Sequence, residues 1–578
     1  TATTKDTYLG PIVIATRGTP TTIKYVNNLG TTSTSNVLAY KNSTDQTLHW
    51  ADPANNEANA CMHAIQPGQL PGSIGPLNCA LNYGGAIPAV VHLHGGEVPP
   101  QLDGGPDGWF TSNGTRGHAY YSKDGTGAKN YAIYRYPNTQ EAAPLWFHDH
   151  TLGVTRLNVY AGLAGGYVIV DPLNDPTNVP TGRSTEPLIP LVIQDRMFDT
   201  TGQLLFPNAP INPEHPFWVP EFVGDVIVVN GKAWPNLNLE AKRYRFLFLN
   251  GSNARTYEMS FGTGTPMWQI GTDGGYLDAP VRLTKLILMP GERADVIIDF
   301  AGLAGNQLIL RNTARTPFPG GVTPQGTTTG RIMQFTVTPC KRGTCPADTT
   351  FNPATPGATL RGGTNPGPAI VRLTPTTGTN ATPIRRLTLN EVIAPPSIVN
   401  GIPFPGGPLE VIVNNTKYSG HTSPTQRTDF ETITKIGPQN TDVSYYSELP
   451  KEGATEVWEI INLTADAHPI HLHLSQFQLL SRTDFDVKKY LAVYNAAFPC
   501  TGVNCIGTYL PSSGPPFQYA PDASPTLGDP RKCSLPNAVC GGNPDVTPFL
   551  QKKAQPPAPN ELGWKDTVMM LPGQVTRI

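Results

Sequence analysis

The sequence of 578 residues predicts an all-β protein made of several sandwich domains. The first observation is that runs rich in β-branched and aromatic residues alternate with turn signals along almost the whole chain. The second is composition, because 58 glycines and 60 prolines accompany only 15% charged residues, against roughly 25% in an average soluble domain. The third is that no long amphipathic helical pattern is evident. Together they favour many short strands joined by turns.

The predicted strands begin near the amino terminus and recur through the chain. The clearest runs lie at 11–15 (PIVIA), 226–229 (VIVV), 243–249 (RYRFLFL), 283–289 (LTKLILM) and 457–461 (VWEII). Their β-branched and aromatic residues favour extended backbone.

Three blocks follow from the positions of these runs. We expect a first domain over 1–171, closing on GGYVIVDP, and a second over 172–339, closing on IMQFTVTP. The stretch 340–384 is rich in Pro, Gly and Thr and predicts a linker or long loop. A third domain covers 385–578.

Charge and hydropathy argue against two kinds of partner. The formal net charge is −2 and no Lys/Arg-rich run stands out, so we expect no nucleic acid partner. No run approaches 18 consecutive apolar residues, so we expect no membrane-spanning helix. The chain begins at Thr1 without a signal-like segment, and we expect any targeting segment to be absent or already removed.

The eight cysteines fall into local couples within loop-like segments. The couples are Cys61 and Cys79, Cys340 and Cys345, Cys500 and Cys505, and Cys533 and Cys540. No C-x-x-C spacing occurs that would favour zinc, so disulfides are the favoured interpretation. Since disulfides persist in oxidising compartments, we expect an extracellular, cell-surface or periplasmic protein.

Three His-x-His pairs are the strongest functional signal. They are His92 and His94 (VHLHGG), His148 and His150 (WFHDH), and His471 and His473 (HPIHLHL), with His468 three residues before the last pair. In a strand, residues i and i+2 face the same side, roughly 6.6 Å apart. Two imidazoles so placed can enter one cavity and bind different metals of a cluster. One such pair is more often structural, but three in separate parts of a chain are improbable by chance.

The number of these histidines favours a polynuclear copper site. A structural zinc site needs about four ligands, often with cysteine. Six paired histidines and His468 exceed that number. Imidazole suits copper, zinc, iron and nickel, and a histidine-rich cluster favours copper.

Longer motifs give the chain a resemblance to a known family. VVHLHGG, LWFHDHTLGVTRLNVYAGLAGGYVI, KRYRFLFLNGSNARTY, PGERADVIIDF, HPIHLHLSQFQLLSR and GWKDTV resemble the multicopper oxidases, most closely the bacterial spore-coat laccase and bilirubin oxidase branch. The resemblance spans nearly the whole chain. It implies three cupredoxin-like Greek-key β-domains and four copper ions. One is a type 1 ion that takes electrons from substrate. One type 2 and two type 3 ions form a trinuclear cluster, where O₂ becomes water.

The resemblance also assigns roles to single residues. It implies that His92 and His471 bind the type 2 copper, and that the type 3 pair is bound by His94, His148, His150 and His473. His468 would bind type 1 copper, with one edge toward the substrate.

Asp103 is the candidate acid–base residue. It follows the first pair by a short loop and matches an acidic residue near the type 2 copper of the family. A carboxylate there could relay the protons that O₂ reduction needs. The alternative is a turn aspartate before Gly104 and Gly105.

The two ends of the chain depart from the family pattern. The family continues after GWKDTV with a His-Cys-His segment, and this chain ends at Ile578 before that point. A blue-copper site needs a thiolate. We therefore expect an incomplete or processed chain, clipped at its amino end, in which a missing C-terminal segment or a second chain completes the copper sites. The alternative is a relative that has lost type 1 copper.

The favoured function is a laccase-like oxidation of phenolic or similar small reducing substrates, coupled to four-electron reduction of O₂. A metal-ion oxidase acting on Cu, Fe or Mn is one alternative. It would call for a Met-rich or carboxylate-rich approach to type 1 copper, but the sequence has only eight methionines. The adjacent Met569 and Met570 are better explained as a core strand. A non-catalytic cupredoxin-like scaffold is the second alternative.

Overall fold

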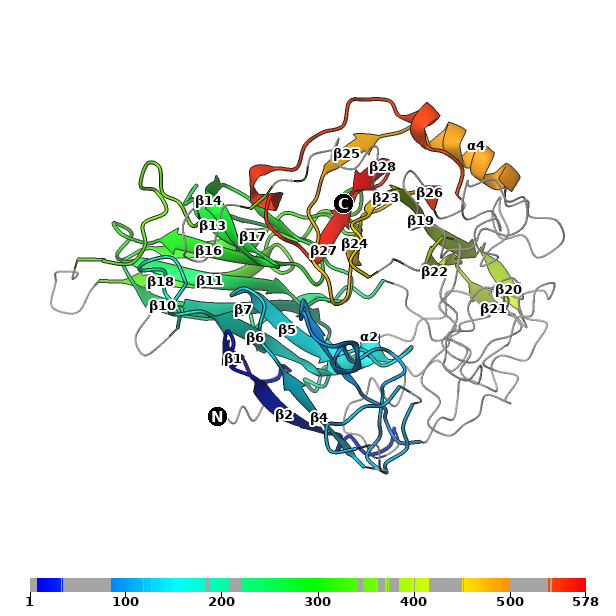
Figure 1. The fold of residues 1–578 in the computed structure, drawn as a ribbon, viewed down its shortest axis with the longest axis horizontal. Coiled ribbons are helices and arrows are strands. Elements are labelled where there is room, and N and C mark those ends of the chain that lie inside the picture. The colour runs from blue at the N-terminus through cyan, green and yellow to red at the C-terminus, as the bar shows by residue number, and fades with distance from the viewer. Residues whose placement is uncertain are drawn as a thin grey trace.

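The computed structural model describes residues 8–32, 34, 85–117, 119–125, 127, 129–182, 188–206, 221–339, 347–361, 370–371, 373, 384–394, 396–399, 401–414, 450, 452–497, 539–540 and 543–578. Strands dominate this part of the chain, which confirms the predicted all-β class (Figure 1). Each described sheet draws its strands from one of the three predicted blocks. The exact domain boundaries remain predictions.

The first block contains the strands β3 (Val91–His94) and β5 (Pro144–Asp149), which carry His92, His94 and His148, and His150 directly follows β5. The four-stranded sheet of this block has the order β1 (Val13–Thr16), β6 (Ala164–Val170), β5 and β3. A separate antiparallel pair consists of β2 (Thr21–Val26) and β4 (Tyr131–Tyr136). Alternate residues of β4 are buried, as period-two side-chain placement dictates. They include Tyr134 and Tyr136, which pack with Tyr167 of β6 in the core of this block. The helix α2 (Thr155–Ala161) follows β5.

The second block is a sandwich of two sheets, seen at the left of Figure 1. The seven-stranded sheet has the order β14 (Gly275–Leu283), β13 (Met267–Thr272), β16 (Arg293–Asp299), β11 (Arg243–Asn250), β7 (Leu188–Arg196), β8 (Val226–Val229) and β9 (Lys232–Ala233). The five-stranded sheet has the order β10 (Asn236–Glu240), β18 (Arg331–Thr338), β17 (Gln307–Asn312), β12 (Tyr257–Phe261) and β15 (Leu286–Leu288). Phe246 of β11 and Phe335 of β18 meet between the sheets, with ring centroids 5.6 Å apart.

Two predicted strands differ from the structure in their extent. The run 11–15 corresponds to β1, which begins two residues later and ends at Thr16. The run 283–289 is not a single strand, because β14 ends at Leu283 and β15 begins at Leu286. β14 pairs with β13 in the seven-stranded sheet, whereas β15 pairs with β12 in the five-stranded sheet. The chain therefore crosses between the two sheets at Thr284 and Lys285, and a continuous strand cannot serve both.

The third block is built on a sheet with the order β22 (Gly407–Val413), β19 (Ile384–Ala394), β23 (Val457–Asn462), β28 (Gln574–Arg577) and β25 (Ser481–Asp484), with β26 (Val539–Cys540) beside β19. Two further antiparallel pairs are β20 (Ser397–Val399) with β21 (Ile402–Phe404), and β24 (His468–His471) with β27 (Thr567–Met570). The helix α4 (Val487–Ala497) follows β25. Met570 is fully buried in β27, so it is a core strand residue, as the sequence favoured.

The short helices are η2 (Pro100–Leu102), η4 (Thr547–Phe549) and η5 (Pro559–Glu561). Part of the predicted linker, 347–361, lies against the first two blocks. Asp348 Oδ2 accepts a hydrogen bond of 2.7 Å from the backbone N–H of Arg243, and Arg361 forms an ion pair with Glu141.

Among the described helices, none has both the length and the apolar character needed to cross a membrane. The cysteine side chains, on which the disulfide prediction depends, lie outside the described residues.

Candidate metal centre

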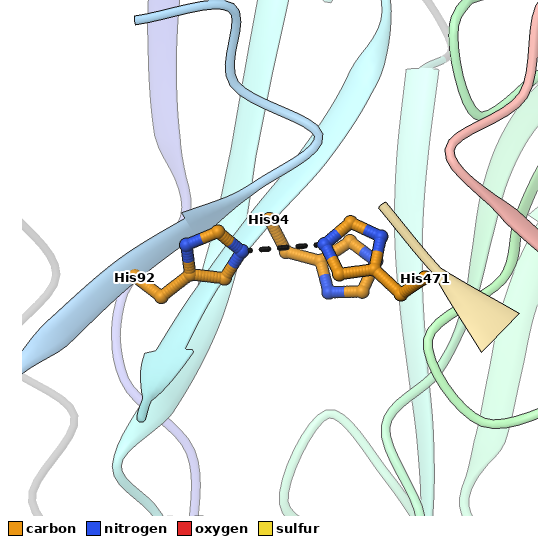
Figure 2. Close-up of side chains that lie close together, drawn as sticks. All are labelled: His92, His94 and His471. Carbon is orange, nitrogen blue, oxygen red and sulfur yellow. Dashed lines mark hydrogen bonds between the residues drawn. The ribbon is translucent and has the colours of Figure 1, made fainter. Parts of the chain in front are cut away.

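Three strands bring the paired histidines together. β3 and β5 are neighbours in the first block, and their register places His92 opposite His148. β24 of the third block faces them, and Figure 2 shows His471 reaching toward His92 and His94. His92 Nε2 lies 3.3 Å from His471 Nε2, and His94 Nδ1 lies 3.3 Å from His148 Nε2. The rings of His94 and His471 are stacked, with centroids 3.5 Å apart and planes 10° from parallel.

The remaining two histidines join the same cluster. His473 stacks on His92 with ring centroids 3.9 Å apart. His150 lies edge-on to His473, at a centroid distance of 4.8 Å. The structure thus gathers all six paired histidines at the boundary between the first and third blocks. Their assignment to individual copper ions remains a prediction.

Backbone carbonyls fix the outer ring nitrogens of three of these histidines. His92 Nδ1 donates to the backbone oxygen of Asp103 at 2.6 Å, and His148 Nδ1 donates to that of Asp149 at 2.8 Å. His471 Nδ1 donates to the backbone oxygen of Asp566 at 2.9 Å. A carbonyl oxygen only accepts, so each Nδ1 carries the ring proton. Nε2 of each neutral ring then presents a lone pair toward the centre of the cluster.

This arrangement fits a bound metal. The Nε2 atoms of His92 and His471 present lone pairs to each other across 3.3 Å, a repulsive contact that a cation relieves. The buried Nδ1 of His150 has no hydrogen-bond partner among the described residues. The ligand atoms of His92, His94 and His471 lie within 4.8 Å of one another. Neutral imidazoles in this number suit copper.

Burial favours the neutral form of His92, His94 and His148. It lowers the pKa of His92 to about 4, with a smaller lowering from His473 and His471 and an opposing effect of Asp103. Burial also lowers the pKa of His94 well below its usual value, and His471 adds to the effect. The pKa of His148 falls well below its usual value for the same reason, with a contribution from His92. Neutral imidazole is the form that binds metal.

Asp103 contacts histidines from both blocks. Its Oδ2 accepts a hydrogen bond of 2.7 Å from His473 Nδ1, and its Oδ1 lies 3.3 Å from His92 Nδ1. Burial alone would raise the pKa of this carboxyl, but the contacts with His473 and His92 outweigh burial and hold it well below its usual value. Asp103 is also a turn residue, because it caps η2 and precedes Gly104, whose φ is 73°. A Cβ at Gly104 would collide with the carbonyl of Val91 on β3.

His468 lies apart from the six clustered histidines and contacts other residues. Its Nε2 is 2.6 Å from Thr464 Oγ1 and 3.4 Å from Asp466 Oδ1, which leaves Nδ1 for a metal. The carboxyl groups of Asp466 and Glu221 are close enough that each affects the pKa of the other. Burial, together with Asp466, raises the pKa of Glu221 to about 8. Burial and Asp466 also raise the pKa of Glu391.

Sequence reasoning did not single out these three carboxylates. Glu221 precedes β8 in the second block, Glu391 is on β19, and Asp466 precedes β24. Only Asp466 stands near His468 in the sequence, and that proximity was the one available signal.

Sequence reasoning also did not single out three residues that lie near the histidine cluster. Arg293 donates to both carboxylate oxygens of Asp566, at 2.7 and 2.5 Å. Asp566 Oδ1 lies 3.3 Å from His94 Nε2, and Thr567 Oγ1 lies 2.9 Å from the same nitrogen. These residues occur in PGERADVIIDF and GWKDTV, which sequence analysis used only for the family resemblance.

Comparison with known proteins agrees with this geometry. A family model described as multicopper oxidase matches residues 412–501. The chain is 31% identical over 573 residues to a laccase of Bacillus subtilis (strain 168), covering 98% of this chain and 82% of that protein. It is 30% identical over 496 residues to multicopper oxidase LPR1 of Arabidopsis thaliana, covering 86% of this chain and 68% of that protein. The crystal structure of a variant of the McoA multicopper oxidase from Aquifex aeolicus has the same fold, with a TM-score of 0.54 at 21% identity. The match covers 98% of this chain and 81% of that chain.

Proposed function

The chain belongs to the multicopper oxidase family, and we propose that it oxidises small reducing molecules and passes their electrons to O₂, which is reduced to water. The observation that carries the proposal is the cluster of six histidines contributed by two blocks of the chain. A scaffold without bound copper would gain nothing from buried imidazoles whose lone pairs face one another.

Seven histidines would hold copper in this proposal. His92 and His471 would bind a type 2 ion, His468 would bind a type 1 ion through Nδ1, and the other two ions would be bound by His94, His148, His150 and His473. Copper so bound supplies one-electron redox chemistry and an O₂-binding centre. The contacts of Asp103 with His92 and His473 support a role for its carboxylate in relaying the protons that O₂ reduction needs.

We propose that the electron donor is a phenolic or similar small organic molecule. The relatives named laccase support this choice. The carboxylate of Asp466 beside His468 Nε2 offers a second support. A phenol that loses an electron becomes strongly acidic, and a carboxylate at the edge of His468 can take its proton.

A metal-ion oxidase is the second candidate, and a specific observation favours it. Glu221, Glu391 and Asp466 gather near His468 from two blocks of the chain. Carboxylate oxygens attract divalent cations. A metal-ion oxidase was expected to have either methionines or carboxylates along the path to the type 1 copper, and these side chains would supply the carboxylates. The donor would then be Fe(II), Mn(II) or a similar ion held by these side chains.

Oxygen uptake by the copper-loaded protein tests the proposal. We expect turnover with one-electron donors, no release of hydrogen peroxide, and loss of turnover when copper is removed by a chelator. Comparing kcat/KM for a phenol with that for Fe(II) separates the two donor classes. A protein that binds no copper would support the scaffold alternative and contradict the proposal.

We also propose a location outside the cytoplasm, and this proposal is based on the cysteine couples alone.

A further inference from the structure

The carboxylate of Asp566 is held by two neighbours next to the histidine cluster. Asp566 is 1% exposed. Its Oδ1 accepts hydrogen bonds from Arg293 Nη1 at 2.7 Å and from Thr567 Oγ1 at 2.8 Å, and its Oδ2 accepts from Arg293 Nη2 at 2.5 Å. Such a bidentate pair fixes both the position and the plane of the carboxylate.

The dipeptide Asp566-Thr567 in turn holds two ligand histidines from different blocks. Because the hydroxyl hydrogen of Thr567 is donated to Asp566, Thr567 Oγ1 accepts from His94 Nε2 at 2.9 Å. The backbone carbonyl of Asp566 accepts from His471 Nδ1 at 2.9 Å. The outer nitrogens of the stacked pair His94 and His471 are therefore fixed by two consecutive residues. Their inner nitrogens, His94 Nδ1 and His471 Nε2, are left to face the cluster.

Arg293 is itself tied to more than one block. It lies at the start of β16, and its Nε donates to the carbonyl of Pro144, the first residue of β5, at 2.7 Å. Its Nη1 donates to Gly291 O at 3.0 Å and its backbone N–H donates to Asp273 Oδ1 at 2.8 Å. One guanidinium thus connects the second block to the strand that carries His148 and to the carboxylate behind His471.

A glycine makes room for this contact. Gly95 directly follows His94 and has a φ of 85°. A Cβ at this position would collide with Arg293 Nη2 and Asp566 Oδ2. The absence of a side chain after His94 allows the ion pair to lie directly against the histidine strand.

We propose that Asp566, Thr567 and Arg293 are positioning residues that set the ring orientation and tautomer of His94 and His471 for copper. None of the six clustered histidines comes from the second block, but Arg293 connects that block to the site through its ion pair with Asp566. The inference rests on the proposed copper binding. A buried ion pair by itself is weak evidence for a contribution to stability. This ion pair fixes the Asp566-Thr567 segment, whose hydroxyl and backbone carbonyl accept hydrogen bonds from two metal ligands. Partners of this kind typically change metal affinity by about 10- to 100-fold.

The second block contains a matched control. Arg245 and Asp295 form another buried bidentate pair, with Arg245 Nε 2.8 Å from Oδ1 and Nη2 2.5 Å from Oδ2 of Asp295. No contact of this pair with the clustered histidines occurs among the described residues. Arg245→Lys therefore perturbs a similar ion pair in the same block without touching the site.

The test uses the full-length copper-loaded protein and its variants Thr567→Val, Thr567→Ser, Arg293→Lys and Arg245→Lys. Copper retention is measured against a competing chelator, and the ligand field of the bound ion is read from the Cu(II) EPR spectrum. We expect about 10- to 100-fold weaker retention in Thr567→Val and Arg293→Lys, with altered EPR parameters. Thr567→Ser keeps the hydroxyl and should restore both readouts. Arg245→Lys should lower the unfolding temperature and leave both readouts as in the wild type.

Two outcomes overturn the inference. One is wild-type retention and EPR parameters in Thr567→Val, which keeps the shape of the side chain and therefore should fold. The other is an equal effect of Arg245→Lys on copper, which would make the role of Arg293 purely structural. If the wild-type protein itself binds no copper, the proposed function fails, and this result is distinct from a failure of the positioning role.

Discussion

Asp103 Oδ2 and His473 Nδ1 are joined by a hydrogen bond of 2.7 Å across the boundary between the first and third blocks. The same aspartate binds His92 of its own block through its backbone carbonyl. One residue therefore links two stacked histidines that approach the cluster from opposite sides. This link ties the placement of the proposed proton-relay residue to the assembly of the site itself.

Asp103→Asn should slow oxygen reduction. The variant keeps the size of the side chain but removes the charge that can bind and release a proton. We expect kcat to fall about 100-fold, within the range typical of general acid–base groups. KM for the donor should change little, because the donor is oxidised near His468. Steady-state oxygen uptake measures both values, with copper content determined in parallel. Wild-type turnover in a fully copper-loaded variant would contradict the role.

Gly104→Ala should displace the same aspartate indirectly. The left-handed backbone at Gly104 and the nearby Val91 carbonyl leave no room for a Cβ. We expect a loss of roughly 1–3 kcal/mol in the free energy of unfolding, together with reduced oxygen uptake. Gly105→Ala is the control, because a Cβ there meets no atom within 4 Å. Equal behaviour of the two variants would argue against a strained turn behind Asp103.

The copper-free protein should lose stability in mild acid. The pKa of His92 is about 4 in the folded protein, whereas it is about 6.5 in an unfolded chain. Between these values the unfolded state binds more protons, so the free energy of unfolding decreases as the pH falls from about 6.5 to about 4. At about 1.4 kcal/mol per pH unit, His92 alone accounts for a decrease on the order of 3 kcal/mol.

Urea unfolding of the chelator-treated protein at pH 7.5, 5.5 and 4.5 measures this effect. His92→Gln should reduce the dependence on pH. Copper should also dissociate over this range, because protons compete for the imidazole nitrogens. Copper content that stays constant through the acid titration would show that these histidines do not bind the metal.

Glu221→Gln should distinguish the two donor classes. The substitution replaces the carboxyl of Glu221, whose pKa is about 8 and which a bound divalent ion would ionise, with an amide of the same size. If divalent ions are donors, we expect kcat/KM for Fe(II) to fall about 10-fold, equivalent to about 1.4 kcal/mol of lost binding. The value for a phenol should stay within a factor of two or so. Glu240→Gln is the control, since Glu240 lies on β10 and is half-exposed. An equal fall for both donors would indicate a general disturbance of His468.

Local pattern predicted a large part of the fold. The run 226–229 is a strand with the predicted bounds, and 243–249 and 457–461 are strands that extend one residue further. The failure at 283–289 has a clear cause, because β propensity shows where the backbone is extended but not which sheet it joins. Only the tertiary structure shows that the chain changes sheets at Thr284 and Lys285.

The histidine pairs could be predicted from the amino-acid sequence alone, because strand geometry places residues i and i+2 on one face whatever the rest of the chain does. It also determined the family, through motifs spread over the chain. Two contacts became visible only in the folded protein: Arg293 of the second block binds Asp566 of the third, and Glu221 lies beside Asp466 near His468. These residues are separated by more than 200 positions, and no local periodicity links them. They meet because separate sheets pack together, so these contacts exist only in the folded protein.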